Sequence, residues 1–177
     1  FKENKDIVGV IHFAAFKAVA DSVEEPLIYY KNNIDSLLIL IELMEEYAVK
    51  NLVFSSSCTV YGTPKDDIQV TEDTPLQPAI SPYGHTKLVA EDIIKNIANS
   101  KAIKAVLLRY FNPIGAHKSA KIGELPIGRP SNLIPFITQT AIGIREFLTV
   151  NGDSYNTADG TNVRDYIHVT DLANAHI

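Results

Sequence analysis

Three residues in the first half of the chain, Ser57, Tyr83 and Lys87, have the types and spacing for acid–base chemistry. Tyr83 and Lys87 are four residues apart, so on a helix their side chains would share one face. An ammonium group beside a phenol favours the phenolate, which can act as a base. Ser57 follows a short apolar run and could share or relay the proton of a substrate hydroxyl. These three side chains are therefore the candidate catalytic group.

The ordinary pKa of tyrosine decides how much help such a base needs. An unperturbed tyrosine titrates near pH ~10, roughly three units too high for base work at neutral pH. Each pKa unit corresponds to about 1.4 kcal/mol, so Lys87 and a cationic cofactor together must supply about 4 kcal/mol. Tyr-x-x-x-Lys also arises by chance in many helices. Three serines that end a predicted strand, at 55–57, and a capped helix start before Tyr83 favour the catalytic interpretation.

Strands and helices alternate along the part of the chain that must position these residues. The apolar run 7–15 is continuous, as expected of a strand covered by helices on both faces, and further strands are predicted over 51–55 and 102–109. Helices are predicted over 26–47 and 81–99, the second because Ser-Pro is typical of a capped helix start. This order predicts an α/β fold with a doubly wound, Rossmann-like parallel sheet.

The second part of the chain differs from the first in its residue composition. From Asn112 onward, prolines and glycines predict long loops around one helix at about 132–145, so we place a domain boundary between 1–111 and 112–177. The last residues begin with a threonine cap at Thr170 and an apolar rhythm that stops within about two turns. We expect a segment of a longer chain, with the smaller second region incomplete at its C-terminal end.

Composition excludes several classes of function. The chain has 177 residues, 46% hydrophobic and 21% charged, with 16 basic and 21 acidic residues and a net charge of -5, which argues against nonspecific nucleic-acid binding. Its longest aliphatic run, 37–41, is far shorter than the roughly 20 residues that span a bilayer, so no membrane segment is expected. One cysteine, Cys58, excludes an internal disulfide and multi-cysteine metal sites, no histidine pattern indicates a metal, and a cytoplasmic location is expected.

Four motifs occur in an order that is specific to one family: Ser-Ser-Ser-Cys-Thr-Val-Tyr-Gly at 55–62, Ser-Pro-Tyr-Gly-His-Thr-Lys at 81–87, Leu-Arg-Tyr-Phe-Asn-Pro-Ile-Gly-Ala-His at 108–117, and Val-Arg-Asp-Tyr-Ile-His-Val at 163–169. With the first two, the chain resembles the extended short-chain dehydrogenase/reductase family. The last two narrow the resemblance to the UDP-glucose 4-epimerases of that family. The resemblance covers nearly all of the chain.

The resemblance implies a bound NAD, a UDP-hexose substrate and the interconversion of UDP-glucose and UDP-galactose. A hydride leaves C4 of the sugar while Tyr83 removes the hydroxyl proton, the 4-keto sugar rotates, and the hydride returns to its other face. By the same resemblance Lys87 and Lys17 hold the cofactor ribose hydroxyls. The residues implied to line the NAD site are Phe13, Ala14, Asn32, Tyr83 and Phe111.

Further site residues are implied for the sugar nucleotide. The resemblance places Asn112, Asn132, Leu133 and Arg164 there, beside Ser57 and Tyr83, and a guanidinium fork such as that of Arg164 suits a diphosphate. Thr149 and Asn151 fall near the expected uracil site. The helices predicted over 26–47 and 81–99 carry broad apolar faces. The family often pairs such helices across a dimer, so the resemblance implies a homodimer as a possibility.

Two comparisons with family patterns decide which alternatives stay open. Related dehydratases and decarboxylases place an acid just before Val-Tyr-Gly, where this chain has Cys58 and Thr59, so dehydration is disfavoured. The glycine-rich turn that approaches a dinucleotide pyrophosphate is absent, so we expect the first strand-helix-strand portion to lie outside this segment. The alternatives are a noncatalytic module that cannot hold NAD, and a related sugar-nucleotide reductase or dehydratase.

Overall fold

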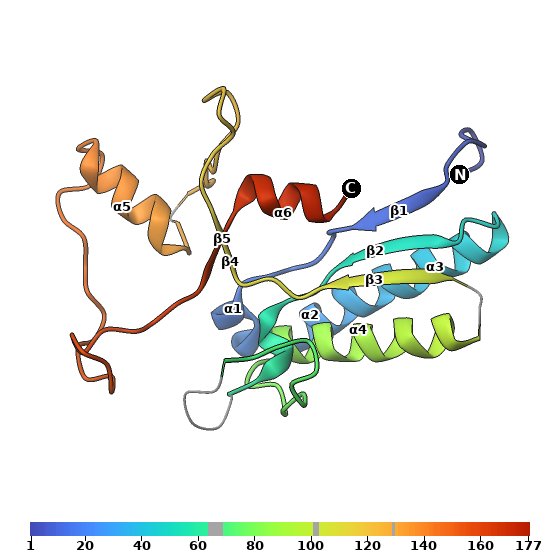
Figure 1. Ribbon diagram of the computed structural model, residues 1–177, viewed down its shortest axis with the longest axis horizontal. Helices are drawn as coiled ribbons and strands as arrows, with labels where there is room; N and C mark the ends of the chain where they lie inside the picture. The colour runs from blue at the N-terminus through green and yellow to red at the C-terminus, as the bar shows by residue number, and fades with distance from the viewer. Residues whose placement is uncertain (64–68, 101–102, 129) are drawn as a thin grey trace. The chain divides into compact units, whose positions relative to one another are not determined.

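The computed structural model describes residues 1–63, 69–100, 103–128 and 130–177 (Figure 1). The chain divides into two compact units. The first comprises residues 1–110 and His176, and the second comprises residues 111–175 and Ile177.

A parallel sheet organises the first unit. Its strands β1 (Gly9–His12), β2 (Asn51–Ser55) and β3 (Lys104–Leu108) lie in the order β1-β2-β3, and β2 has the bounds that its apolar pattern predicts. This confirms the parallel α/β class. β1 is shorter than the apolar run that contains it, and the predicted start of β3 at Ala102 lies outside the described residues.

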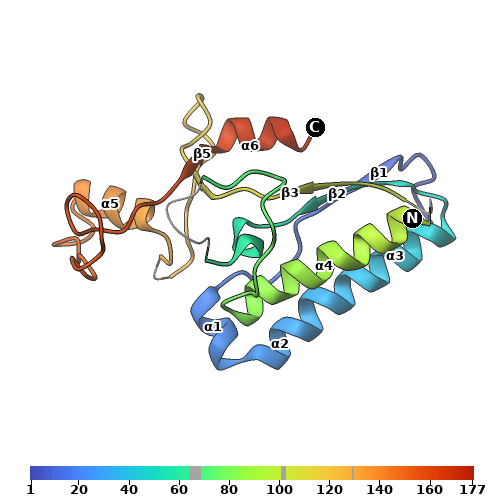
Figure 2. The ribbon, with the colours of Figure 1, turned by 60° about the horizontal axis from the view of Figure 1, so that its bottom comes forward.

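One face of this sheet carries the hydrophobic core. Successive strand residues point to opposite faces, so Leu52 and Phe54 of β2 face the helical layer. Helices α3 (Ser36–Glu46) and α4 (Pro82–Asn99) lie side by side along that face (Figure 2). The buried cluster consists of Leu37, Ile41, Met44, Val49, Leu52, Phe54, Ala90, Ile94 and Ile103. Each large side chain in it contributes roughly 1.5–3 kcal/mol by burial.

The opposite face differs from the sequence-based expectation. A strand covered on both faces was expected at 7–15, but Ile11 is 47% exposed and Val106, in the same row across the sheet, is 52% exposed. The reason is that α3 and α4 contact the alternate set of strand residues. Within the described residues of this unit, the continuous apolar pattern therefore corresponds to one covered face.

The helices follow the predicted pattern with one interruption. The stretch predicted as a helix over 26–47 forms α2 (Pro26–Tyr30), a π-helical turn η1 (Lys31–Asp35) and α3. A short helix, α1 (Val19–Glu24), precedes them and was not predicted. None of the helices in the described ranges is long and apolar enough to cross a membrane.

The N-terminus of α4 has the predicted cap, with the Ser81 Oγ accepting a hydrogen bond of 3.1 Å from the Gly84 N–H. Because this bond satisfies a helix N–H that has no partner within the helix, Ser81→Ala should lower the free energy of unfolding by about 1 kcal/mol in urea denaturation. Ser100→Ala is the control, since the exposed Ser100 hydroxyl only donates back to the Ile97 carbonyl and its loss should change stability by less than about 0.5 kcal/mol. Equal effects would contradict the capping argument.

The described part of the second unit contains two strands and a further helix besides the one helix that the sequence predicted. Strands β4 (Asn112–Ile114) and β5 (Tyr166–His168) form a parallel pair, and helix α6 (Val169–Ala175) follows β5 directly. The predicted helix is present as α5 (Leu133–Ala141) but stops short of residue 145. Gly143, at φ 77, adopts the left-handed conformation that ends a helix. Thr170, expected as a cap, lies inside α6.

Candidate active site

The end of β2 meets α4 at the three residues predicted to be catalytic. Lys87 Nζ donates a hydrogen bond of 2.7 Å to the Ser55 carbonyl, and the Ser57 side chain lies near enough to Tyr83 to lower the pKa of the phenol. Ser55, Ser57 and Lys87 are all buried. The sequence spacing therefore places Tyr83 and Lys87 on one helix face, directed at the carboxyl end of a central strand, where parallel sheets bind ligands.

The pKa of Tyr83 shows whether the phenol can act as a base. Burial raises its pKa above the ordinary value, and the interaction with Ser57 acts in the opposite direction, because a donor to the phenol oxygen favours the phenolate. Lys87 Nζ lies 5.9 Å from the centre of the Tyr83 ring. The protein alone therefore leaves the phenol protonated at neutral pH, and further positive charge at the site is needed to form the phenolate.

Lys87 is a buried cation, only 5% exposed. Burial lowers its pKa from 10.5 to about 8, so it keeps its proton at neutral pH. Its Nζ also lies 4.9 Å from the centre of the Phe54 ring. Burial and the positive charge of Lys87 lower the pKa of His12, which stacks on Phe54 at 5.8 Å and is a core residue, as its apolar strand suggested.

The loop after β1 carries three of the residues that the family resemblance assigned to the cofactor, Phe13, Ala14 and Lys17, and all three are exposed. Asn32, also exposed, lies in η1. Asn33, which sequence reasoning missed, fixes this loop.

Asn33 is buried and holds both backbone groups of Phe16. Its Oδ1 accepts from the Phe16 N–H at 2.8 Å, and its Nδ2 donates to the Phe16 carbonyl and to Thr86 Oγ1, each at 3.1 Å. Two adjacent asparagines inside a predicted helix are unusual, because asparagine is a weak helix former. That anomaly was the available sequence signal for a positioning residue.

A second missed residue, Glu91, lies one turn beyond Lys87 and is completely buried. Its carboxylate accepts two hydrogen bonds from Arg109, at 2.8 and 2.7 Å, one of 2.6 Å from Ser56 Oγ, and one of 3.1 Å from Lys95. Burial alone would raise the pKa of Glu91, but these donors outweigh burial and hold it below the ordinary value. An acidic residue on the buried stripe of a predicted helix was the sequence signal.

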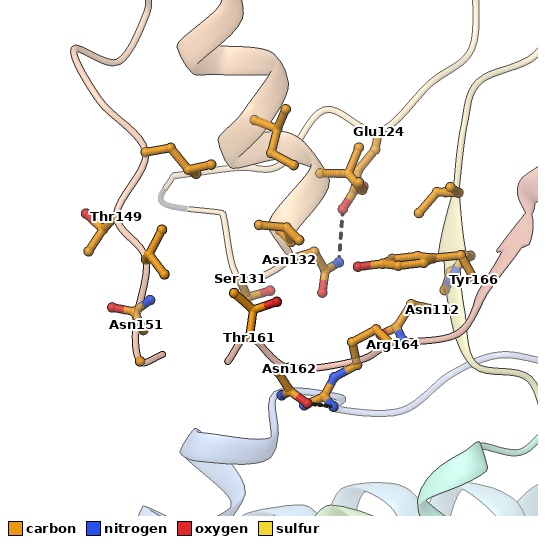
Figure 3. Close-up of a pocket in the computed structure, with 18 of the residues that line it drawn as sticks. Asn112, Glu124, Ser131, Asn132, Thr149, Asn151, Thr161, Asn162, Arg164 and Tyr166 are labelled. Atoms are coloured by element: carbon orange, nitrogen blue, oxygen red, sulfur yellow. Dashed lines mark hydrogen bonds between the residues drawn. The ribbon is translucent and has the colours of Figure 1, made fainter. Parts of the chain in front are cut away.

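The second unit contains a cavity of about 640 Å³ (Figure 3). Its walls include four of the six residues expected at the sugar nucleotide and both expected near uracil, namely Asn112, Asn132, Leu133, Arg164, Thr149 and Asn151. The other two, Ser57 and Tyr83, belong to the first unit. Thr149 and Asn151 lie on the side of the cavity away from Asn112 and Tyr166 (Figure 3). Phe111, expected at the cofactor, is half-buried beside Asn112 in the sequence.

Polar groups in this cavity suit a charged, aromatic ligand. Asn132 Nδ2 donates to Glu124 Oε1 at 3.1 Å, which fixes the amide, and Tyr166 points toward Asn132 (Figure 3). Arg164 Nη1 donates to Asn162 Oδ1 at 2.7 Å. Among the described lining residues, Arg164 provides the positive charge and Glu124 the negative. Glu124 and Tyr166 were not predicted from the sequence.

Several known proteins that resemble this chain are named UDP-glucose 4-epimerase. The family model described as "NAD dependent epimerase/dehydratase family" matches residues 1–177. UDP-glucose 4-epimerase 2 of Arabidopsis thaliana is 55% identical over 178 residues, which cover 100% of this chain and 50% of that protein. The chain therefore spans about half the length of the relatives it matches.

Two solved structures also resemble the chain. UDP-glucose 4-epimerase from Bifidobacterium longum, in complex with NAD+ and UDP, has a TM-score of 0.92 and 49% identity, covering 99% of this chain and 52% of that one. The enzyme from Stenotrophomonas maltophila, with bound NAD and formylated UDP-arabinopyranose, has a TM-score of 0.89 and 49% identity, covering 96% of this chain and 50% of that one. The Rossmann-like interpretation of the first unit agrees with both.

Proposed function

The chain belongs to the NAD dependent epimerase/dehydratase family, and we propose that the complete protein interconverts UDP-glucose and UDP-galactose at C4 of the hexose. The observation that carries the proposal is the convergence of Ser57, Tyr83 and Lys87 at the carboxyl end of β2. A phenol, a hydroxyl that can donate to it and a buried ammonium are the groups needed to move the proton of a sugar hydroxyl. The names of the relatives support the same reaction.

NAD fits the chemistry of these side chains. When bound, NAD would supply the acceptor for the C4 hydride and the donor that returns it. Lys87 suits a ribose because an ammonium has three donors, and the Ser55 carbonyl accepts one of them here. Lys17 would hold the same sugar, and the cofactor would lie against Phe13, Ala14, Asn32 and Phe111. The pKa of Tyr83 also fits, because a cationic cofactor adds the positive charge that the phenol needs.

The roles of the protein groups follow from their chemistry. Tyr83 removes the proton of the C4 hydroxyl, and Ser57 stabilises the phenolate by donating a hydrogen bond to it. After the 4-keto sugar has rotated, Tyr83 returns the proton to the oxygen. Cys58 and Thr59 provide no carboxylic acid beside this site, so the dehydratase alternative is less favoured.

The sugar nucleotide would be held by the residues that line the cavity of the second unit. Arg164 would bind the diphosphate, because a guanidinium fork matches phosphate oxygens. Asn112, Asn132 and Leu133 would contact the sugar nucleotide, with uracil near Thr149 and Asn151. The single cysteine suits a reducing compartment, so we propose a cytoplasmic location.

A homodimer is part of the proposal. Leu27 and Ile28 of α2 are 66% and 50% exposed, and Ile39 of α3 is 56% exposed. Apolar side chains exposed on two consecutive helices would be covered by a second copy of the chain. Size-exclusion chromatography with light scattering measures this directly.

Purified complete protein should convert UDP-galactose to UDP-glucose without added NAD and without steady NADH accumulation. The physical reason is that the hydride returns to the sugar it left, so the net redox change is zero. Chromatographic separation of the two sugars and absorbance of NADH are the measurements. Stoichiometric NADH would instead indicate a dehydrogenase. A folded protein that binds no NAD and converts neither sugar would support the noncatalytic module.

A further inference from the structure

We propose that Ser56, Glu91 and Arg109 form a positioning network that holds Ser57 and Lys87 in place around Tyr83. This inference rests on the proposed function. Its basis is that two consecutive serines at the end of β2 are hydrogen-bonded to different turns of α4, Ser55 to Lys87 and Ser56 to Glu91. Ser57, the next residue, acts on the pKa of Tyr83 in the turn before Lys87.

Ser56 is the central link of this set. It is 2% exposed, and its Oγ donates to Glu91 Oε1 at 2.6 Å. Its N–H also donates to the Phe54 carbonyl at 3.0 Å. Fixing Ser56 at both groups sets the backbone on either side, and therefore the direction of the Ser55 carbonyl and the Ser57 side chain.

Arg109 anchors the carboxylate that holds Ser56. Its two hydrogen bonds to Glu91 are charge-assisted and have a forked geometry, which fixes orientation as well as distance. Arg109 Nη1 also donates to Tyr61 Oη at 3.3 Å and to the Glu72 carbonyl at 3.4 Å. Tyr61 ends the 3₁₀ turn η2 (Cys58–Tyr61), which begins directly after Ser57.

The geometry joins elements that all border the candidate catalytic group. Glu91 is on α4, Ser56 follows β2, Arg109 follows β3, and Tyr61 is on η2. A carboxylate at their junction fixes the strand end relative to the helix face that carries Tyr83. Small displacements of a proton donor weaken its effect on a transition state, so the network should affect turnover more than substrate affinity.

Ser56→Ala in the complete protein tests the proposal, because it removes one hydroxyl and leaves Glu91 paired with Arg109. We expect kcat to fall about tenfold with little change in KM. We also expect the Tyr83 titration to move to higher pH by about 0.5–1 unit, since the Ser57 donor is no longer fixed. The titration is followed by ¹³C NMR of labelled tyrosines, with the Tyr83 signal assigned by its loss in Tyr83→Phe.

Ser56→Ala removes none of the titratable groups around Tyr83. They are Lys87 on its own helix, Cys58 on η2, Tyr110 after β3 and Tyr29 on α2. A shift in the Tyr83 titration therefore reports on the position of Ser57 and Lys87.

Lys95→Ala is the matched control. It removes another donor to the same carboxylate, at 3.1 Å, but Lys95 is 41% exposed and contacts neither serine, so kcat and the titration should stay at wild-type values. Glu91→Gln is the second variant, and it should move the titration in the same direction as Ser56→Ala by loosening the Arg109 anchor.

Lower thermal stability in both network variants, with unchanged kcat and unchanged Tyr83 titration, would show that the network is structural only. The proposed function fails separately, if the wild-type protein does not epimerise UDP-galactose. In that case the NMR titration still decides whether Ser56 and Glu91 position Ser57 and Lys87.

Discussion

Tyr83→Phe in the complete protein should lower the turnover of UDP-galactose by at least about 10²-fold, the low end for the loss of a general base. The phenol is the only group changed, and no other described side chain at the carboxyl end of β2 combines a phenol with contacts to Ser57 and Lys87. NAD content should stay at the wild-type level because Lys87 and the β1 loop are intact. Turnover and bound NAD are measured on the same preparation.

Tyr30→Phe is the matched control for this substitution. It also removes one phenol hydroxyl, whose oxygen lies 3.0 Å from His85 Nδ1 in an exposed pair between α2 and α4. The loss of this exposed hydrogen bond should leave turnover within about twofold of the wild type. Near-normal turnover of Tyr83→Phe, or an equal loss in both variants, would remove Tyr83 from the catalytic assignment.

The features that sequence predicted best are those specified by neighbouring residues. The start of α4 follows from Ser81-Pro82, because the cap and the fixed proline φ act within one turn. The bounds of β2 follow from a short apolar run that ends in serines. Tyr83 and Lys87 could be placed on one face because helical spacing alone sets their relation.

The features that sequence did not predict depend on distant partners. Glu91 is neutralised by Arg109, 18 residues away, and holds Ser56, 35 residues away, so its role requires the three-dimensional arrangement of two strands and a helix. Asn33 likewise hydrogen-bonds to residues far away in the sequence, Phe16 at 17 residues and Thr86 at 53. The pair of β4 and β5 escaped prediction because three-residue strands are too short for a periodic pattern.

Lys87→Met should make the protein more stable at neutral pH. The folded-state pKa of about 8 lies below the ordinary 10.5, so between these values the unfolded chain binds more protons and stability rises with pH. Below pH ~8, the buried ammonium costs up to about 3 kcal/mol. Because methionine also loses the hydrogen bond to the Ser55 carbonyl, the net gain should be about 1–2 kcal/mol in urea denaturation. The gain should shrink toward pH ~10.

The same substitution should impair catalysis. Without the ammonium the phenolate of Tyr83 forms only at higher pH, so the rise of activity should move by about one to two pH units. Turnover at neutral pH should then fall about 10- to 100-fold. Ser57→Ala should also lower activity, but with a smaller alkaline shift, because it removes a hydrogen-bond partner and no charge. Single-turnover rates across pH separate the two effects from misplacement of the sugar.

Lys95→Met, on the exposed end of the same helix face, is the control for removing a lysine charge, and it should change neither the pH profile nor stability appreciably. Equal pH profiles for the wild type and Lys87→Met, with NAD still bound, would contradict the coupling between Tyr83 and Lys87 and leave Lys87 as a cofactor ligand alone. Lower stability of Lys87→Met at neutral pH would contradict the argument from burial. A more stable and less active variant is the result expected if Lys87 is a buried charge kept for its function.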